Sequence, residues 1–290
     1  MNFRGVGVAL VTPFKSDKSI DFEALRRLVD EVIAGGVDFL VALGTTAETP
    51  TLNADEKLAV LQCVIEQNAQ RKPLVVGIGG NNTQEVIATI NRYPMEQVDG
   101  ILSVVPYYNK PVQEGLFQHF SAIAAATDKP IILYNVPGRT VTNMLPATSI
   151  RLAKAHKNIV AIKEASGNMP QCMELVQDAP EGFCILSGDD NLVLPQMAVG
   201  FHGVISVAAN CFPRYFCKMV HEAMHGNYGV ARQLHYKLLK GIDLLFAEGN
   251  PAGVKYALHK AGIMENELRL PLIPVSEGLQ ARFDEYLANL

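Results

Sequence analysis

The sequence has few charged residues and no excess of positive charge. Charged side chains make up only 19% of the 290 residues, whereas 49% are apolar. This balance is too apolar for a disordered chain and is sufficient for a large core. The low charged fraction also favours an oligomer that hides part of the surface. The net charge of −4, without a basic stripe, argues against nucleic acid as a partner.

The cysteines are few, odd in number and never arranged as Cys-x-x-Cys. They are Cys63, Cys172, Cys184, Cys211 and Cys217. This pattern argues against a disulfide framework and against a thiolate zinc site, and it favours a reducing, cytoplasmic setting. No run of about eighteen apolar residues occurs, which argues against a membrane-spanning helix. The short apolar run of residues 5–11 ends at Pro13 without a cleavage site, so it predicts a first strand and not a signal peptide.

Short, β-rich apolar runs recur at the spacing of strand–helix units. They begin at Val6, Phe39, Leu74, Ile101, Ile131, Ile159, Phe183 and Val204. Helical periodicity fills the intervals, and possible capping boxes run from Asn53 to Glu56 and from Asn82 to Glu85. Eight such units predict an α/β fold, a closed (β/α)₈ TIM barrel. A doubly wound sheet is the alternative, but residues 11–14 lack the glycine fingerprint that such a sheet usually carries after its first strand.

Three helical stretches follow the last predicted strand, at about residues 213–225, 229–246 and 251–261. No low-complexity linker precedes them. We therefore expect residues 1–212 to form the barrel that carries the active site. Residues 213–290 are expected to form a C-terminal helical extension packed on it.

Active sites of such barrels lie at the carboxyl ends of the strands, which makes Lys163 the most informative residue. It directly continues the run Ile159–Ile162, so an aliphatic wall should lie beneath it and desolvation should favour the neutral amine. A neutral lysine can attack a ketone and form a Schiff base, which serves as an electron sink. The alternative is a lysine paired with Glu164 on a solvated rim.

Other strand ends supply groups that a Schiff-base aldolase needs. Tyr134 can carry protons, Thr45 and Thr46 can donate hydrogen bonds to a carboxylate, and Arg139 can bind a second acid group. Each residue also has an ordinary structural explanation. Their coincidence on one predicted face favours the catalytic one.

Five motifs occur in a characteristic order. They are Gly44-Thr45-Thr46-x-Glu48, Tyr107-Tyr108-Asn109-Lys110-Pro111, Tyr134-Asn135-Val136-Pro137-Gly138-Arg139-Thr140, Ile162-Lys163-Glu164-Ala165 and Ser187-Gly188-Asp189-Asp190. With them, essentially the whole chain resembles the dihydrodipicolinate (4-hydroxy-tetrahydrodipicolinate) synthase family of pyruvate-dependent class I aldolases. The resemblance implies a lyase without metal or other cofactor, built as a homotetramer. Such a lyase would condense pyruvate with aspartate 4-semialdehyde in lysine and diaminopimelate biosynthesis.

The resemblance also implies roles for individual residues. Lys163 would form the imine with pyruvate, and Tyr134 would relay protons. Thr45 would link Tyr134 to Tyr108, which would reach in from the neighbouring subunit.

The same resemblance implies the substrate contacts. Thr45 and Thr46 would hold the pyruvate carboxylate, Arg139 would bind the carboxylate of the semialdehyde, and the backbones of Gly188 and Ile205 would contact the imine. Ala47 stands where the family usually has glycine. If that position needs a positive φ, the threonines would be displaced slightly.

A lysine effector site is implied at the dimer interface in members that lysine inhibits. Asn81, Glu85 and Tyr107 match it here. Ala54 and Lys57 stand where sensitive enzymes carry histidine, and Lys57 would repel a cationic effector. These two departures leave feedback inhibition by lysine open.

Three alternative functions stay open at this point. The segment His221-Glu222-x-x-His225 has the form of a zinc-peptidase helix, but it lies beyond the last strand and has no apparent third ligand. A sugar-acid lyase such as N-acetylneuraminate lyase would share Lys163 and Tyr134 but lacks an arginine at the position of Arg139. A keto-acid-binding barrel without turnover would not require the full catalytic set.

Residues 77–82 begin like a dinucleotide loop but lack its last glycine, and the pair Asp189-Asp190 suggests a helix cap beside a solvated charge.

Overall fold

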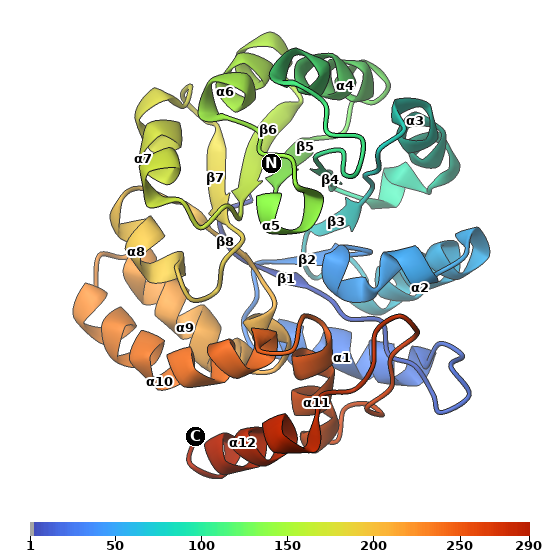
Figure 1. Ribbon diagram of the computed structural model, residues 1–290, viewed down its shortest axis with the longest axis vertical. Coiled ribbons are helices and arrows are strands. Elements are labelled where there is room, and N and C mark those ends of the chain that lie inside the picture. Colours follow the sequence, from blue (N-terminus) through green and yellow to red (C-terminus); the bar gives the residue numbers. More distant parts are fainter. Residues whose placement is uncertain (1–2) are drawn as a thin grey trace.

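Eight parallel strands close into a barrel in the computed structural model, which describes residues 3–290 (Figure 1). The strands are β1 (Gly5–Ala9), β2 (Phe39–Ala42), β3 (Leu74–Gly77), β4 (Gly100–Val104), β5 (Ile131–Asn135), β6 (Ile159–Glu164), β7 (Cys184–Ser187) and β8 (Gly203–Ser206). Each pairs with the next along the chain, and β8 pairs with β1. The predicted (β/α)₈ barrel is confirmed, every strand begins within one residue of the expected position, and the doubly wound alternative is excluded.

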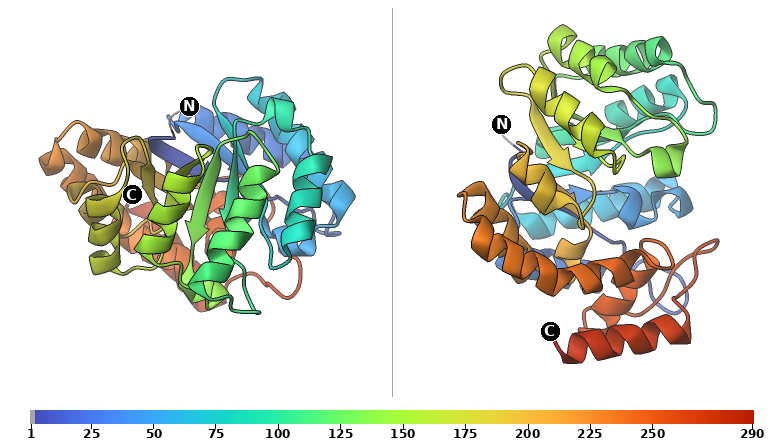
Figure 2. Two further views of the ribbon diagram at one scale, coloured as in Figure 1. Left: turned by 90° about the horizontal axis from the view of Figure 1, so that it is seen from above. Right: turned by 60° about the vertical axis from the view of Figure 1, so that its left-hand side comes forward.

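Helices surround the barrel and cover the outer faces of its strands (Figures 1 and 2). They are α1 (Phe22–Ala34), α2 (Ala54–Asn68), α3 (Thr83–Arg92), α4 (Gln113–Ala125), α6 (Pro146–Ala155), α7 (Met169–Asp178), α8 (Val193–Ala198) and α9 (Pro213–Met224). The short helix α5 (Pro137–Thr140) and the 3₁₀ turns η1 (Thr45–Ala47), η2 (Thr49–Thr51), η3 (Met95–Gln97) and η4 (Ala208–Asn210) lie in the connections.

The two expected capping boxes have different outcomes. Asn53 and Glu56 bond reciprocally at the start of α2, as predicted. At α3 the Asn82 side chain accepts from the backbone N–H of Gln84, so the predicted box with Glu85 is wrong. Residues 78–82 form the connection from β3 into α3, which agrees with a loop leading into a capped helix.

The chain ends in helices that pack beside the barrel (Figure 2). After α9 come α10 (Tyr228–Phe246), α11 (Ala252–Lys260) and α12 (Glu277–Ala288). The helices α9, α10 and α11 match the three expected stretches. Helix α12 is not among the predicted stretches, although its Ser276 cap and the buried Leu279 and Phe283 are a helical signal. The division of the chain at residue 212 stays a prediction. Helix α9, the first element after that boundary, contacts strand β1 of the barrel.

The barrel interior is packed with side chains. Phe3 and Phe39 meet edge to face at 5.6 Å, and Ile205 and Leu186 belong to the same interior cluster as Tyr134. Successive strand residues point to opposite faces, so every second side chain enters this interior. Because the interior is filled, chemistry is confined to the strand ends. In residues 3–290 no helix is long and apolar enough to cross a membrane.

Candidate active site

Lys163 lies near the carboxyl end of β6 and is only 5% exposed. It faces Tyr134 of the neighbouring β5, since the two residues are register partners. The Nζ atom lies 4.4 Å from the centroid of the Tyr134 ring. The strand end thus places a buried primary amine against an aromatic ring that carries a phenol.

Glu164 points to the other face of β6 and has its own partners. Its carboxylate accepts hydrogen bonds from Asn135 Nδ2 at 3.0 Å, Ser166 N at 2.7 Å and Gln171 Nε2 at 3.2 Å. Burial raises the pKa of this carboxyl, and these donors oppose the shift. The alternative of Lys163 paired with Glu164 on a solvated rim is therefore wrong.

The threonines lie on the turn that follows β2. Thr45 is exposed at the rim of a cavity, whereas Thr46 is buried and its Oγ1 accepts from Asn250 Nδ2 at 3.0 Å. Ala47 does not have a positive φ; the left-handed residue is Glu48, with φ of 53°. The substitution of glycine by alanine at position 47 therefore causes no backbone strain in this loop.

A cavity of about 440 Å³ opens at the carboxyl ends of the strands and gathers three of the predicted residues. Thr45, Tyr134 and Arg139 line it, and Arg139 comes from α5, which lies over the barrel mouth (Figure 1). Asn250, between α10 and α11, also lines it, and its backbone oxygen accepts from Arg139 Nη2 at 3.4 Å. Sequence reasoning missed Asn250, because nothing local connects a residue after α10 with strand ends.

Gly188 lies against the Lys163 side chain, whereas Ile205 lies in the barrel interior. A Cβ at Gly188 would fall 3.1 Å from Cε of Lys163 and 2.5 Å from Cβ of Ala165, so only glycine leaves room for the lysine. Ile205 is 1% exposed in the barrel interior. Gly188 thus borders the Lys163 side chain, and Ile205 belongs to the same interior cluster as Tyr134.

The acidic pair after β7 differs from its expected role. Asp190 is buried, and its Oδ2 accepts from the N–H groups of Val207 at 3.0 Å and Ala208 at 2.7 Å. Burial raises the pKa of Asp189 to about 6, and the charge of Lys163 opposes the shift. Neither residue caps α8, which begins after Leu192. The prediction of a cap beside a solvated charge is wrong, and the two carboxyl groups form part of the polar surroundings of Lys163.

Tyr108 is not brought into the cavity of its own chain. It is 87% exposed and has a left-handed φ of 71°. Its neighbour Tyr107 lines the main cavity and also a second one of about 280 Å³. A single chain therefore assembles every predicted catalytic residue except Tyr108.

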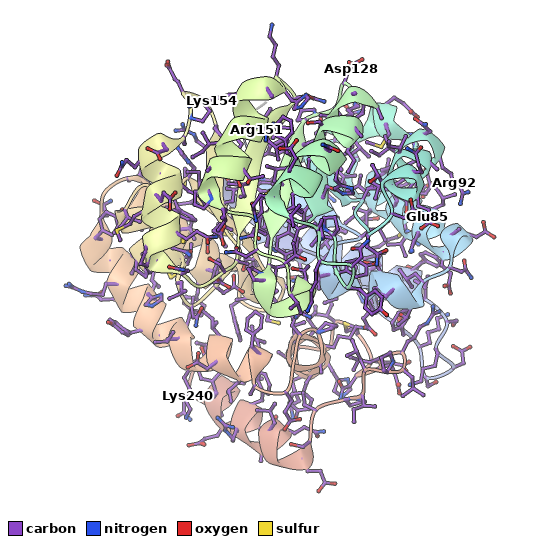
Figure 3. All side chains as sticks on the ribbon, turned by 45° about the horizontal axis from the view of Figure 1, so that its top comes forward. Glu85, Arg92, Asp128, Arg151, Lys154 and Lys240 are labelled. Carbon is purple, nitrogen blue, oxygen red and sulfur yellow. The ribbon has the colours of Figure 1, made fainter. Side chains whose placement is uncertain are left out.

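The second cavity collects the residues of the expected effector site. Asn81, Glu85, Ala54 and Lys57 line it together with Tyr107. Arg92 of α3 also lines this cavity, and Figure 3 shows it on the same helix as Glu85. The cavity thus contains two cationic side chains beside one carboxylate.

The segment His221-Glu222-x-x-His225 is not arranged as a metal centre. His221 Nε2 is 2.7 Å from Oδ2 of Asp38, whereas His225 is exposed beyond the end of α9. Within the described part of the chain, no three His, Cys, Asp or Glu side chains are grouped closely enough to hold a metal ion.

The chain is similar to proteins of one family along its whole length. A sequence model of the dihydrodipicolinate synthetase family matches residues 2–290. The 4-hydroxy-tetrahydrodipicolinate synthase of Flavobacterium psychrophilum is 50% identical over 288 residues, which are 99% of this chain and 98% of the relative.

Solved structures agree with this similarity. Dihydrodipicolinate synthase from Thermotoga maritima is 41% identical, with a TM-score of 0.96 over 100% of this chain and 99% of its own. The chloride-inhibited enzyme from Acinetobacter baumannii, in complex with pyruvate, is 38% identical, with a TM-score of 0.96 over 99% of both chains.

The His221–Asp38 pair predicts a pH-dependent contribution to stability. The hydrogen bond that His221 donates to the Asp38 carboxylate raises the pKa of His221 above 6.5, so the stabilisation is complete below that value and is lost as pH rises through the folded-state pKa. Both side chains are about one-third exposed, so we expect only about 0.5–1 kcal/mol. Urea unfolding of His221→Gln should show this loss at acidic pH and little at alkaline pH. His225→Gln is the matched control, and identical pH profiles for His221→Gln and wild type would contradict the prediction.

Proposed function

The chain belongs to the dihydrodipicolinate synthetase family, and from that membership we propose that it condenses pyruvate with L-aspartate 4-semialdehyde to 4-hydroxy-tetrahydrodipicolinate. This reaction serves lysine and diaminopimelate biosynthesis. The observation that carries the proposal is the buried amine of Lys163 against Tyr134, beside a cavity that Arg139 lines. The relatives at about 50% identity are synthases, which favours this reaction over that of a sugar-acid lyase.

The proposed mechanism begins with attack of the neutral Lys163 amine on the keto carbon of pyruvate. Loss of water gives a protonated imine, with Tyr134 carrying protons to and from the reacting oxygen. The imine withdraws electrons from the methyl carbon, which loses a proton and becomes an enamine. This carbon attacks the aldehyde, whose oxygen takes up a proton. The amino group of the semialdehyde then displaces Lys163, which closes the ring and regenerates the free lysine.

The two substrates each bring a carboxylate, and the site has a separate donor set for each. Thr45 and Thr46 would bind that of pyruvate, and the backbones of Gly188 and Ile205 would border the imine. Asn250 supports this assignment, because it holds the Thr46 hydroxyl and contacts the Arg139 guanidinium. Arg139 would bind the carboxylate of the semialdehyde through two parallel donors.

We further propose a homotetramer, a dimer of dimers, in which Tyr108 enters the site of a neighbouring subunit and completes a relay through Thr45 to Tyr134. The exposure of Tyr108 at 87%, of Val112 at 74% and of Val141 at 68% supports a contact surface near the cavity mouth. If these side chains form one contiguous apolar patch, that patch is typical of an interaction site. A cytoplasmic location fits the five cysteines, all of which are unpaired.

The second cavity is proposed as an effector site with altered selectivity. Glu85 could pair with an ammonium group, but Lys57 and Arg92 line the same cavity and would repel it. We therefore propose that free lysine is a poor inhibitor of this enzyme.

The Schiff base is tested by borohydride reduction in the presence of pyruvate. One adduct per chain should form, and peptide mapping should place it on Lys163, because this is the buried amine beside the cavity. Lys163→Ala should abolish trapping and turnover in an assay with both substrates, whereas Lys154→Ala, on the outer helix α6 (Figure 3), should leave both unchanged. An adduct on another residue, or undiminished trapping in Lys163→Ala, would refute the assignment.

The trans contribution of Tyr108 is tested by mixing two inactive variants, Tyr108→Phe and Lys163→Ala. A heterodimer would contain one intact composite site out of two. Half of the dimers in an equal mixture are heterodimers, so activity should return to about a quarter of the wild-type value. Mixtures of Tyr134→Phe and Lys163→Ala are the control, because those residues act in the same chain and cannot complement. No recovery despite proven subunit exchange would show that Tyr108 does not act in trans.

Arg139→Ala tests the recognition of the second substrate. A bidentate carboxylate contact in a partly dry site contributes about 2–4 kcal/mol, so kcat/KM for the semialdehyde should fall roughly 30-fold to 1,000-fold. Pyruvate trapping on Lys163 should persist. Arg151→Ala, an exposed arginine of α6 (Figure 3), is the control. Equal loss of trapping and turnover would mean that Arg139 maintains the site, and full efficiency would place the carboxylate elsewhere.

Lysine inhibition is tested by titrating free lysine into the assay. Wild-type activity should be unaffected at millimolar concentrations. The double variant Ala54→His/Lys57→His should gain inhibition, because removal of one like charge relieves about 1 kcal/mol of repulsion. Strong inhibition of the wild-type enzyme would show that Lys57 does not oppose the effector.

A further inference from the structure

Glu48 and Lys255 form a buried ion pair between the turn after β2 and the C-terminal helix α11. The exposed fractions are 2% for Glu48 and 0% for Lys255, and Oε1 of the glutamate is 2.5 Å from Nζ of the lysine. Apolar side chains of similar volume usually serve stability as well as a buried pair does. Stability alone therefore gives no reason for this pair.

Backbone groups complete the surroundings of both charges. Lys255 Nζ donates to the carbonyl oxygen of Glu267 at 2.9 Å, and Glu48 Oε2 accepts from the N–H of Arg269 at 3.1 Å. The buried ring of Phe14 lies 4.0 Å from Lys255 Nζ and 4.5 Å from Arg269 Cζ. The pair thus joins the β2 turn to residues 267–269.

The position of Glu48 in its turn makes this connection relevant to the site. Its φ of 53° is the left-handed conformation, which costs free energy for a residue other than glycine. Glu48 is separated from the two threonines only by Ala47, and its N–H donates to the carbonyl oxygen of Thr45 at 3.3 Å. The ion pair with Lys255 and the hydrogen bond from the Arg269 N–H fix the Glu48 carboxylate. They therefore help to fix the turn that carries Thr45 and Thr46.

The other end of the connection also reaches the cavity. Arg269 is anchored by Glu56, with Nη2 to Oε1 at 2.6 Å. The chain then continues into Pro271 and Leu272, which line the cavity with Thr45. One buried pair thus tethers two walls of the cavity, from segments more than two hundred residues apart in the chain.

We propose that Lys255 is a positioning residue for pyruvate: through Glu48 it sets the place of the threonines that bind the pyruvate carboxylate. The inference rests on the proposed function, which supplies pyruvate as the ligand. Because the carboxylate is held in both the ground state and the transition state, loss of the pair should raise KM for pyruvate by more than it lowers kcat, which falls only as far as the Thr45 relay is disturbed.

Glu48→Gln, Lys255→Met and the double variant Glu48→Gln/Lys255→Met provide the test. Lys260→Met is the matched control, because Lys260 lies on the same helix in an exposed pair with Asp284. The double variant leaves no unpaired buried charge. Its melting temperature should therefore be the highest of the three variants, below that of wild type. Its KM for pyruvate should nevertheless rise roughly 10-fold to 100-fold, with kcat within about 3-fold of wild type.

A purely structural role predicts a different pattern. The melting temperature would fall in the single variants and recover in the double variant, and KM for pyruvate would be unchanged in every folded protein. That result would overturn the proposed role of Lys255 and leave the proposed function intact. If wild-type protein neither traps nor turns over pyruvate, the proposed function fails, and the inference fails with it.

A second measurement uses the wild-type enzyme. Burial lowers the pKa of Lys255 to about 8, while Glu48 and Glu267 oppose the shift and Arg269 adds to it. The pair is therefore charged below about pH 8 and loses its positive partner above it. KM for pyruvate should rise above this pH in wild type and in Lys260→Met, without the same rise in the double variant. A KM that stays constant through this range in wild type would overturn the inference.

Discussion

Closure of the parallel barrel is the constraint on which the site depends. Because every strand is paired on both sides, the alternation of side chains is fixed at each position, and a shift by one residue would exchange interior and exterior. Lys163 enters the interior and Glu164 the helix layer for this reason alone. Register pairing of β5 with β6 then brings Tyr134 to the lysine. The proposed catalytic pair therefore follows from the sheet, with no loop needed to position it.

The rest of the cavity is built from segments that the sheet does not organise. Arg139 comes from α5 and Asn250 from the connection between α10 and α11, and they touch through the Asn250 backbone. Asn250 also reaches Thr46, so the two proposed carboxylate sites share one supporting residue. The C-terminal region therefore contributes directly to the cavity.

Buried charge marks the places where this fold departs from a purely apolar core. Glu164, Asp190 and the Glu48–Lys255 pair are all removed from water, and each has hydrogen-bond donors or an opposite charge close by. Such groups are costly to bury unless they are satisfied, and they fix geometry more strictly than apolar contacts do. They surround the strand ends that carry Lys163 and the threonines. Rigidity is thus concentrated where substrates would have to be held.

The sequence by itself determined the eight strands, the positions of Tyr134 and Lys163 near strand ends, and the segments after the strands that carry Thr45 and Arg139, because periodicity and strand order are local properties. Only the tertiary structure decided the rest. Asn250 beside Thr46, Lys255 beside Glu48, the burial of Asp190 and the exposure of Tyr108 leave no periodic trace in the chain. Whether a polar side chain is solvated or buried depends on partners more than 200 residues away, and those partners meet only when the barrel closes.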